Sequence, residues 1–316
     1  HNRANNNLYM KQVFALVIGI GLAIGALALI LSFAPTPEIE QSQQKKVAAT
    51  IFPLYDITKN IAGTTVDVEL ILEAGASPHT FDPSPATMRK LQGTQAVYAI
   101  GHGLDDWTFS IVENIEAQIV GVDRNIDLRQ SVDHDHETDL SNPHDEEFAN
   151  LDPHYWLSIS NAKIIAKTIA NDLTDRFPEH TDSYQENLNE YIKELDQANA
   201  QIQETIDQIT NKQIITLHDA WYYFSNAYGL EVAGIFEPTA GREPSPQYLA
   251  DLTEAVIASG SNTLYSEPQL STLSIQAFSN DNDLTIVELD PIGGIENRQS
   301  YTDMMKYNAE IFFQNQ

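Results

Sequence analysis

Three histidines stand at comparable places in the sequence, beside the ends of apolar segments. His79 follows TVDVELIL in the turn GASPH, His218 ends QIITL, and His154 lies in LDPHYWLS. A carboxylate, Asp290, follows the apolar segment TIVEL. Three neutral imidazoles and one carboxylate satisfy a tetrahedral divalent cation. Because a single histidine in a turn is more often a solvated residue than a ligand, the prediction of a metal site depends on the four residues together.

The predicted ligands favour Zn²⁺ over Mn²⁺. Zinc is a borderline-soft ion that imidazole nitrogen suits, whereas manganese prefers an oxygen-rich shell. Position 218 carries an imidazole, which keeps the predicted set rich in nitrogen. Mn²⁺ remains the alternative ion, because affinity order alone does not decide which metal a cell supplies.

A second histidine group lies in a short acidic segment, residues 133–147, which contains His134, His136 and His144. One interpretation is a loop that binds a further ion weakly and passes it inward. A solvated acidic loop without an ordered metal explains the composition equally well, because ordering a flexible segment costs about 1 to 2 kcal/mol per residue. Both interpretations stay open for these histidines.

The composition narrows the classes of function. The chain has 316 residues, 45 acidic against 17 basic side chains and a formal charge of -28, which repels nucleic acid and attracts cations. There is no cysteine in the sequence, so disulfides, thiolate metal sites and a lipid-modified cysteine are excluded. We therefore expect no nucleic-acid partner, and a metal site made of nitrogen and oxygen ligands.

Residues 13–33 form an uncharged apolar run that is long enough to cross a bilayer core of about 30 Å as a helix. Arg3 and Lys11 precede it, which predicts that the body of the chain lies on the extracytoplasmic face of the membrane, periplasmic or at the cell surface. Because Pro35 directly after Ala34 would hinder a signal peptidase, an uncleaved anchor is favoured, with a cleaved signal as the alternative.

The elements that must position the histidines alternate between strands and helices, which predicts an α/β fold. We expect two lobes with parallel sheets flanked by helices, joined by one long rigid helix. Ligands bind beyond the carboxyl ends of such strands, so the metal site should lie in the cleft between the lobes. The apolar repeat of the long helix covers that helix alone, which argues against a coiled-coil dimer, and we expect a monomer.

The expected organisation has six parts. They are an N-terminal extension at 1–12, the anchor or signal segment at 13–33, a linker at 34–46, the N-terminal lobe at 47–180 with its histidine-bearing loop at 133–147, the linking helix at 181–210, and the C-terminal lobe at 211–316. Three carboxylates near the histidine motifs, Asp82, Asp219 and Glu267, are candidates to fix the imidazole tautomers.

Several motifs, in one order along the chain, carry a family resemblance. They are VAATIFPLYDITKNIAG, GASPHTFDPSPATMRKL, DPHYWLS, LHDAWYYF, EPSPQYL, SEPQL and LDPIGG. From about Val47 to its end the chain resembles the zinc- and manganese-type solute-binding proteins of metal ABC importers, known as cluster A-I. The resemblance implies that His79, His154 and His218 bind the metal and that Asp290 matches the family's variable fourth ligand.

The resemblance also implies a binding protein, not an enzyme, with the membrane permease of a metal ABC importer as its partner. Many bacterial members are anchored through a lipidated cysteine, which this chain lacks. A zinc hydrolase is the alternative of another class, but His134 and His136 lack the further motifs of such enzymes, and no HExxH sequence occurs. A metal-binding adhesin is a further alternative, because one fold can serve several functions.

Overall fold

The computed structural model describes Met10 and residues 45–131, 151–237, 244–273 and 275–316. The account below concerns the unit Gln44–Gln316. The predicted anchor at 13–33 and the histidines of the acidic segment, His134, His136 and His144, lie outside the described residues. In the part of the chain that is described, no helix combines the length and hydropathy needed to span a bilayer.

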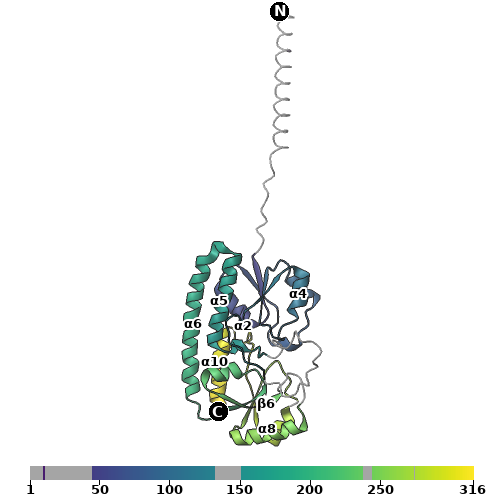
Figure 1. Cartoon of the computed structure of the whole chain (residues 1–316), viewed down its shortest axis with the longest axis vertical. Coiled ribbons are helices and arrows are strands. Elements are labelled where there is room, and N and C mark those ends of the chain that lie inside the picture. Colours follow the sequence, from purple (N-terminus) through teal and green to yellow (C-terminus); the bar gives the residue numbers. More distant parts are fainter. Residues whose placement is uncertain (1–9, 11–44, 132–150, 238–243, 274) are drawn as a thin grey trace, which may run out of the picture. The chain divides into compact units, whose positions relative to one another are not determined.

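Two parallel sheets of four strands form the body, as the alternating sequence pattern predicts (Figure 1). The first sheet has the order β2-β1-β3-β4 and the second the order β6-β5-β7-β8. The strands are β1 Lys46–Ala49, β2 Asp67–Leu70, β3 Ala96–Ala99, β4 Gln118–Gly121, β5 Gln213–His218, β6 Glu231–Glu237, β7 Thr263–Ser266 and β8 Thr285–Glu288. Each half of the chain therefore repeats one strand order, with its earliest strand second in the sheet.

Helices cover the sheets and connect their strands. They are α2 Phe52–Ala62, η1 Pro78–Thr80, α3 Pro85–Lys90, α4 Thr108–Ile115, η2 Tyr155–Leu157, α5 Ile159–Arg176, η3 Pro178–His180, α6 Thr181–Asp207, α7 Tyr222–Tyr228, α8 Pro246–Ser259, α9 Ile275–Asp281 and α10 Tyr301–Asn315. In β1, Val47 and Ala49 pack into one core while Ala48 packs into another. This first sheet is thus buried on both faces, as parallel sheets usually are.

The long helix α6 connects the two halves. It packs against α2 and α5 of the first half and against α10 at the end of the second (Figure 1). One stripe of its side chains is buried at helical spacing: Tyr184, Leu188, Tyr191, Leu195, Ala198, Ile202 and Ile206. Because this stripe repeats every three to four residues, a single face of α6 meets all three partners. The prediction of two α/β lobes and a long linking helix is confirmed.

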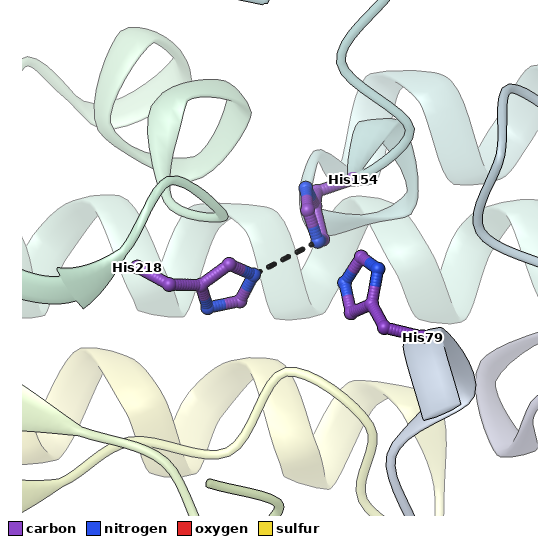
Figure 2. A group of neighbouring side chains, drawn as sticks. All are labelled: His79, His154 and His218. Atoms are coloured by element: carbon purple, nitrogen blue, oxygen red, sulfur yellow. Dashed lines mark hydrogen bonds between the residues drawn. The ribbon is translucent and has the colours of Figure 1, made fainter. Parts of the chain in front are cut away.

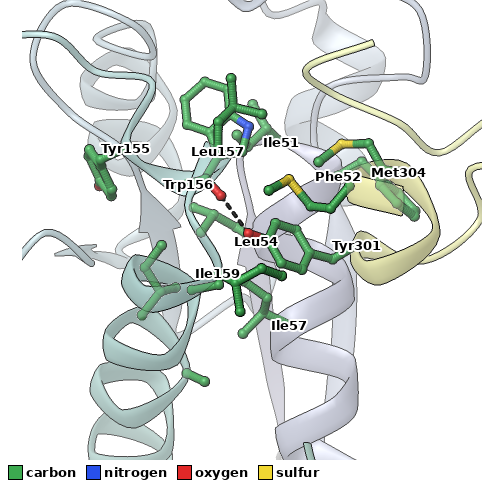
Figure 3. Close-up of a cluster of buried hydrophobic side chains, with 14 of the residues drawn as sticks. Ile51, Phe52, Leu54, Ile57, Tyr155, Trp156, Leu157, Ile159, Tyr301 and Met304 are labelled. Atoms are coloured by element: carbon green, nitrogen blue, oxygen red, sulfur yellow. Dashed lines mark hydrogen bonds between the residues drawn. The ribbon is translucent and has the colours of Figure 1, made fainter. Parts of the chain in front are cut away.

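A shared core fixes the segment that carries His154 against both halves. Figure 3 shows Trp156 and Leu157 among side chains of α2 and α10, and the hydroxyl of Tyr301 donates to the carbonyl of Trp156 at 2.6 Å. The indole of Trp156 donates to the carbonyl of Pro291 at 2.7 Å. Trp156 and Tyr301 are fully buried. The loop after β8 and the start of α10 therefore hold the turn in which His154 lies.

Candidate metal site

Three turns at the ends of strands or helices carry the predicted histidines. His79 lies in η1, which follows β2, and His218 is the last residue of β5. His154 directly precedes η2. The structure brings the three together: one ring nitrogen from each lies within 4.8 Å of the other two, and Figure 2 shows the rings pointing toward one another.

The rings are arranged around one point. The ring centroids of His154 and His218 are 5.0 Å apart, and those of His79 lie 5.6 Å from His154 and 5.7 Å from His218. Nε2 of His218 is 3.2 Å from Nε2 of His154. Two nitrogens that bind one tetrahedral Zn²⁺ at 2.0 to 2.1 Å are about 3.3 Å apart, so the observed separation matches a shared ion.

Carboxylates hold the other nitrogens of two rings. Nδ1 of His154 donates to Oδ1 of Asp152, and Nδ1 of His218 donates to Oε1 of Glu267, each at 2.9 Å. Carboxylates only accept hydrogen bonds, so each pair places the proton on Nδ1. The two Nε2 atoms face each other at hydrogen-bond distance, so in the absence of metal they share a proton, and a metal ion would take its place. This pattern of imidazoles oriented by carboxylates is typical of metal ligands.

Arg129 contacts Asp152, which holds the ring of His154, and Asp219, which is next to His218. Its guanidinium forms an ion pair with Asp219, the neighbour of His218, and its Nε is 3.6 Å from Oδ2 of Asp152. The guanidinium also lies over the ring of Tyr222, 4.3 Å from its centroid. Arg129 belongs to the first half and Asp219 and Tyr222 to the second, so one cation ties the carboxylates of both halves together.

Burial and charge shift the pKa of two histidines in opposite directions. Desolvation of the ring, followed by the neighbouring His154 and His218, lowers the pKa of His79 to about 3, although the outer part of this residue is exposed. Burial lowers the pKa of His218 as well, but the charge and hydrogen bond of Glu267 outweigh it and raise that pKa above 6.5. His79 is therefore neutral at physiological pH, as a ligand must be.

Asp290 lies outside the group of mutually close ligand atoms, which contains the three histidines. Its Oδ1 accepts from the backbone amides of Ile292 and Gly293, at 3.0 and 2.9 Å, and its Oδ2 is 3.2 Å from the guanidinium of Arg298. The carboxylate is fully buried. Its role as a fourth metal ligand stays a prediction, since metal binding by this carboxylate would compete with these contacts.

The histidines share a small cavity with residues of both halves. Its volume is about 10 Å³, and its other walls include Trp156, Glu267, Gln269, Leu270 and Ile292. This is close to the room that one water molecule needs.

Sequence reasoning found some of the supporting residues and missed others. Glu267 contacts a histidine, as predicted, whereas Asp219 contacts Arg129 and Asp82 is exposed. Asp152 and Arg129 were not predicted. Asp152 stands two residues before His154, and its Oδ1 also accepts from the backbone amide of His154. An aspartate two residues before a candidate ligand is a signal for such a turn.

Comparison with known proteins places the chain in a family. The sequence model of the family described as "Zinc-uptake complex component A periplasmic" matches residues 47–314. The manganese ABC transporter substrate-binding lipoprotein PsaA of Streptococcus anginosus is 28% identical over 316 residues, covering 95% of this chain and 97% of that protein. The zinc-binding protein AdcA of Streptococcus pyogenes serotype M3 is 27% identical over 281 residues, covering 84% of this chain and 55% of that protein.

Solved structures share the fold. The crystal structure of ZnuA superimposes with a TM-score of 0.73 at 24% identity, covering 86% of this chain and 98% of that one. The family match spans both sheets, the linking helix and all three histidines of the cleft. The chain therefore belongs to the metal-binding solute receptors of zinc- and manganese-type ABC importers, the family described as the periplasmic component A of the zinc-uptake complex.

Proposed function

We propose that the chain captures Zn²⁺ outside the cytoplasm with His79, His154 and His218 and delivers it to the permease of a metal ABC importer. The observation that supports this most strongly is the meeting of three imidazoles from distant parts of the sequence within 4.8 Å. Two of these rings are oriented by buried carboxylates, which is how proteins prepare imidazoles for a metal. Family membership supports delivery to an importer.

The choice of zinc follows from the chemistry of the donors. Three nitrogens suit a borderline-soft ion, whereas Mn²⁺ prefers carboxylate and water oxygens. Relatives are named for either metal, manganese in PsaA and zinc in AdcA, so family membership leaves the cargo open. The donor set within 4.8 Å contains no carboxylate among the described residues, which supports Zn²⁺.

Glu267 argues for a binding site over a hydrolytic one. A zinc hydrolase needs a carboxylate that is free to take a proton from bound water. Glu267 lines the cavity, but its Oε1 accepts from Nδ1 of His218 and from the indole of Trp221, at 2.9 and 3.0 Å. This carboxylate therefore orients a ligand, as a transport site requires.

A competition titration of the full chain tests the proposal. After metal removal with a chelator, we expect one tightly bound Zn²⁺ per chain and at least tenfold weaker binding of Mn²⁺. His154→Ala and His218→Ala should each weaken Zn²⁺ binding by orders of magnitude, because each removes a ligand. His180→Ala is the matched control, since His180 contacts Lys45 and Tyr184 outside the site. Unchanged zinc affinity in the two ligand variants would overturn the proposal.

Transport is tested in cells. Cells that lack the chain should take up less zinc from zinc-poor medium, and the natural chain should restore uptake while the His154→Ala variant should not. Restoration by the variant would show that this site does not supply the importer.

A further inference from the structure

The hydroxyl of Tyr223, in the second half, is inserted into a backbone pairing of the first half. The segments of Arg129 and Asp152 run antiparallel and meet at the bridge between Gln130 and Leu151. The amide of Asp152 donates to the carbonyl of Arg129 at 2.8 Å. The return bond runs through Tyr223, whose hydroxyl accepts from the amide of Arg129 at 2.9 Å and donates to the carbonyl of Asp152 at 3.1 Å. Two residues paired in this way normally exchange both bonds directly, so the second half supplies a hydrogen-bonded link that the first half would otherwise make alone.

Tyr223 serves both bonds because its hydroxyl keeps its proton. The residue is buried, with 6% of its surface exposed. Burial raises the pKa of Tyr223 to about 12. The hydroxyl is therefore neutral at physiological pH, and it accepts from one backbone group while it donates to the other.

The start of α7 contacts the supports of two proposed ligands. Trp221, the residue before α7, donates its indole N–H to Glu267, the carboxylate that orients His218. Tyr223, two residues later, donates to the backbone carbonyl of Asp152. The carboxylate of Asp152 in turn accepts from the ring of the ligand that follows it by two residues. One end of α7 therefore connects a histidine of the second half with a histidine of the first.

The inserted hydroxyl gives the pairing a second possible arrangement. If α7 moved away, the amide of Arg129 and the carbonyl of Asp152 would both lose their partner, and buried backbone groups need one. They would then bond directly to each other and complete the antiparallel pair. A direct N–H···O bond of about 2.9 Å is shorter than the path through an inserted oxygen. Direct bonding would thus draw Asp152 away from α7, together with the carboxylate that orients His154.

We propose that Tyr223 is a positioning residue that holds His154 in place through Asp152 and thereby sets the rate at which the metal leaves. The inference rests on the proposed function, because it needs a metal held by the histidines. Separation of the two halves breaks both bonds of the Tyr223 hydroxyl, and the direct bond between Arg129 and Asp152 offsets part of this cost. Opening of the site is then coupled to an exchange of hydrogen bonds beside His154.

The rate of zinc release tests the inference. The full chain is loaded with Zn²⁺ and mixed rapidly with an excess of a chromophoric chelator, whose absorption reports the released ion. Tyr223→Phe removes the hydroxyl and leaves the ion pair of Arg129 with Asp219 in place. Two hydrogen bonds are lost and the direct bond restores one, so zinc should leave about tenfold faster, the equivalent of one hydrogen bond.

Tyr228→Phe is the matched control. Tyr228 lies on the same helix, is buried as well, and donates its hydroxyl to Oδ1 of Asn199 in α6 at 2.9 Å. Both variants lose a buried hydroxyl, so both should lower the melting temperature of the metal-free chain by similar amounts. Only Tyr223→Phe should speed zinc release, which separates positioning of a ligand from a general contribution to stability.

A second background tests the route through Asp152. Asp152→Ala removes the carboxylate that connects the backbone pairing with the ring of His154. In this background Tyr223→Phe should change the release rate by less than about twofold, because the two residues act in one chain of contacts.

Zinc release from Tyr223→Phe at the rate of the natural chain or of Tyr228→Phe would overturn the inference. So would an equally large increase in the Asp152→Ala background, since Tyr223 would then not act through Asp152. Failure of the proposed function looks different, because the natural chain would then release zinc no more slowly than His154→Ala does.

Discussion

Nε2 of His154 and Nε2 of His218 lie 3.2 Å apart, although one residue follows the first sheet and the other ends a strand of the second. The carboxylates of Asp152 and Glu267 place the proton of each ring on Nδ1. This separation is that of a hydrogen bond, which needs a proton on one of the two Nε2 atoms. A metal ion that binds both nitrogens must displace this proton, so metal binding at this pair should release protons.

Glu267→Gln should weaken zinc binding by about 10- to 100-fold, because a neutral amide is a poorer acceptor for the ligand His218. The side chain keeps its size, so the melting temperature of the metal-free protein should change little. Competition with a fluorescent zinc chelator measures the affinity. Glu254→Gln, at an exposed position of α8, is the control. Equal affinity of both variants would contradict the role of Glu267.

Arg129→Met should lower the free energy of unfolding by roughly 3 to 5 kcal/mol, since it leaves the buried carboxylates of Asp152 and Asp219 without their cation. Chemical denaturation of the metal-free chain measures this. Adding Asp219→Asn to the variant should recover part of the loss, because one uncompensated charge is removed. If the double variant lost as much free energy of unfolding as the two single variants together, Arg129 and Asp219 would not be coupled.

Asp56 should make stability depend on pH. Burial raises the pKa of Asp56 from 3.8 to about 6. A hydrogen bond from the amide of Tyr301 opposes this shift, and the nearby charges of Glu194 and Asp303 add to it. The folded state then binds the proton more tightly than the unfolded state, so this group's contribution to stability falls as pH rises from about 4 to about 6. Above that range the ionised carboxylate costs on the order of 3 kcal/mol.

Asp56→Asn keeps an oxygen for the amide of Tyr301 and removes the charge. The variant should match the natural chain near pH 4 and exceed its unfolding free energy at pH 8. Thermal unfolding at both pH values measures the difference. A variant that is less stable than the natural chain at pH 8 would contradict the assigned direction.

Gly294→Ala should destabilise the loop between β8 and α10. Gly294 has φ +80°, and an added Cβ would lie 2.9 Å from the ring of Phe52. We expect a loss of about 2 to 4 kcal/mol, from the backbone strain and the overpacking together. Gly75→Ala separates the two causes, because Gly75 has φ +82° with no atom within 4 Å of the added Cβ. Equal losses in both variants would show that the Phe52 contact is harmless.

Local sequence patterns predicted most strands and helices. They could not predict the contacts between elements that lie far apart in the sequence. The apolar run QIITL placed His218 at the end of a strand, and the periodicity of the long helix from Thr181 was visible in the sequence. The helix α10 was not predicted, although Ser300 accepts from the amide of Asp303 at 3.0 Å, a capping pattern present in the sequence.

The surroundings of the ligands depend on tertiary structure. Arg129 meets Asp219 across 90 residues, and no local spacing connects them. Asp290 follows its strand as predicted. Its Oδ1, however, accepts hydrogen bonds from the backbone amides of Ile292 and Gly293. Such contacts become visible only when the loop conformation is known.

The central claim is that His79, His154 and His218 bind one zinc ion together. Anomalous diffraction from crystals of the zinc-loaded full chain, recorded above and below the zinc absorption edge, tests it most directly. The account predicts one strong zinc peak at about 2.0 to 2.1 Å from a ring nitrogen of each histidine. A zinc peak elsewhere, or three histidine rings that hold no zinc in the loaded crystals, would contradict it.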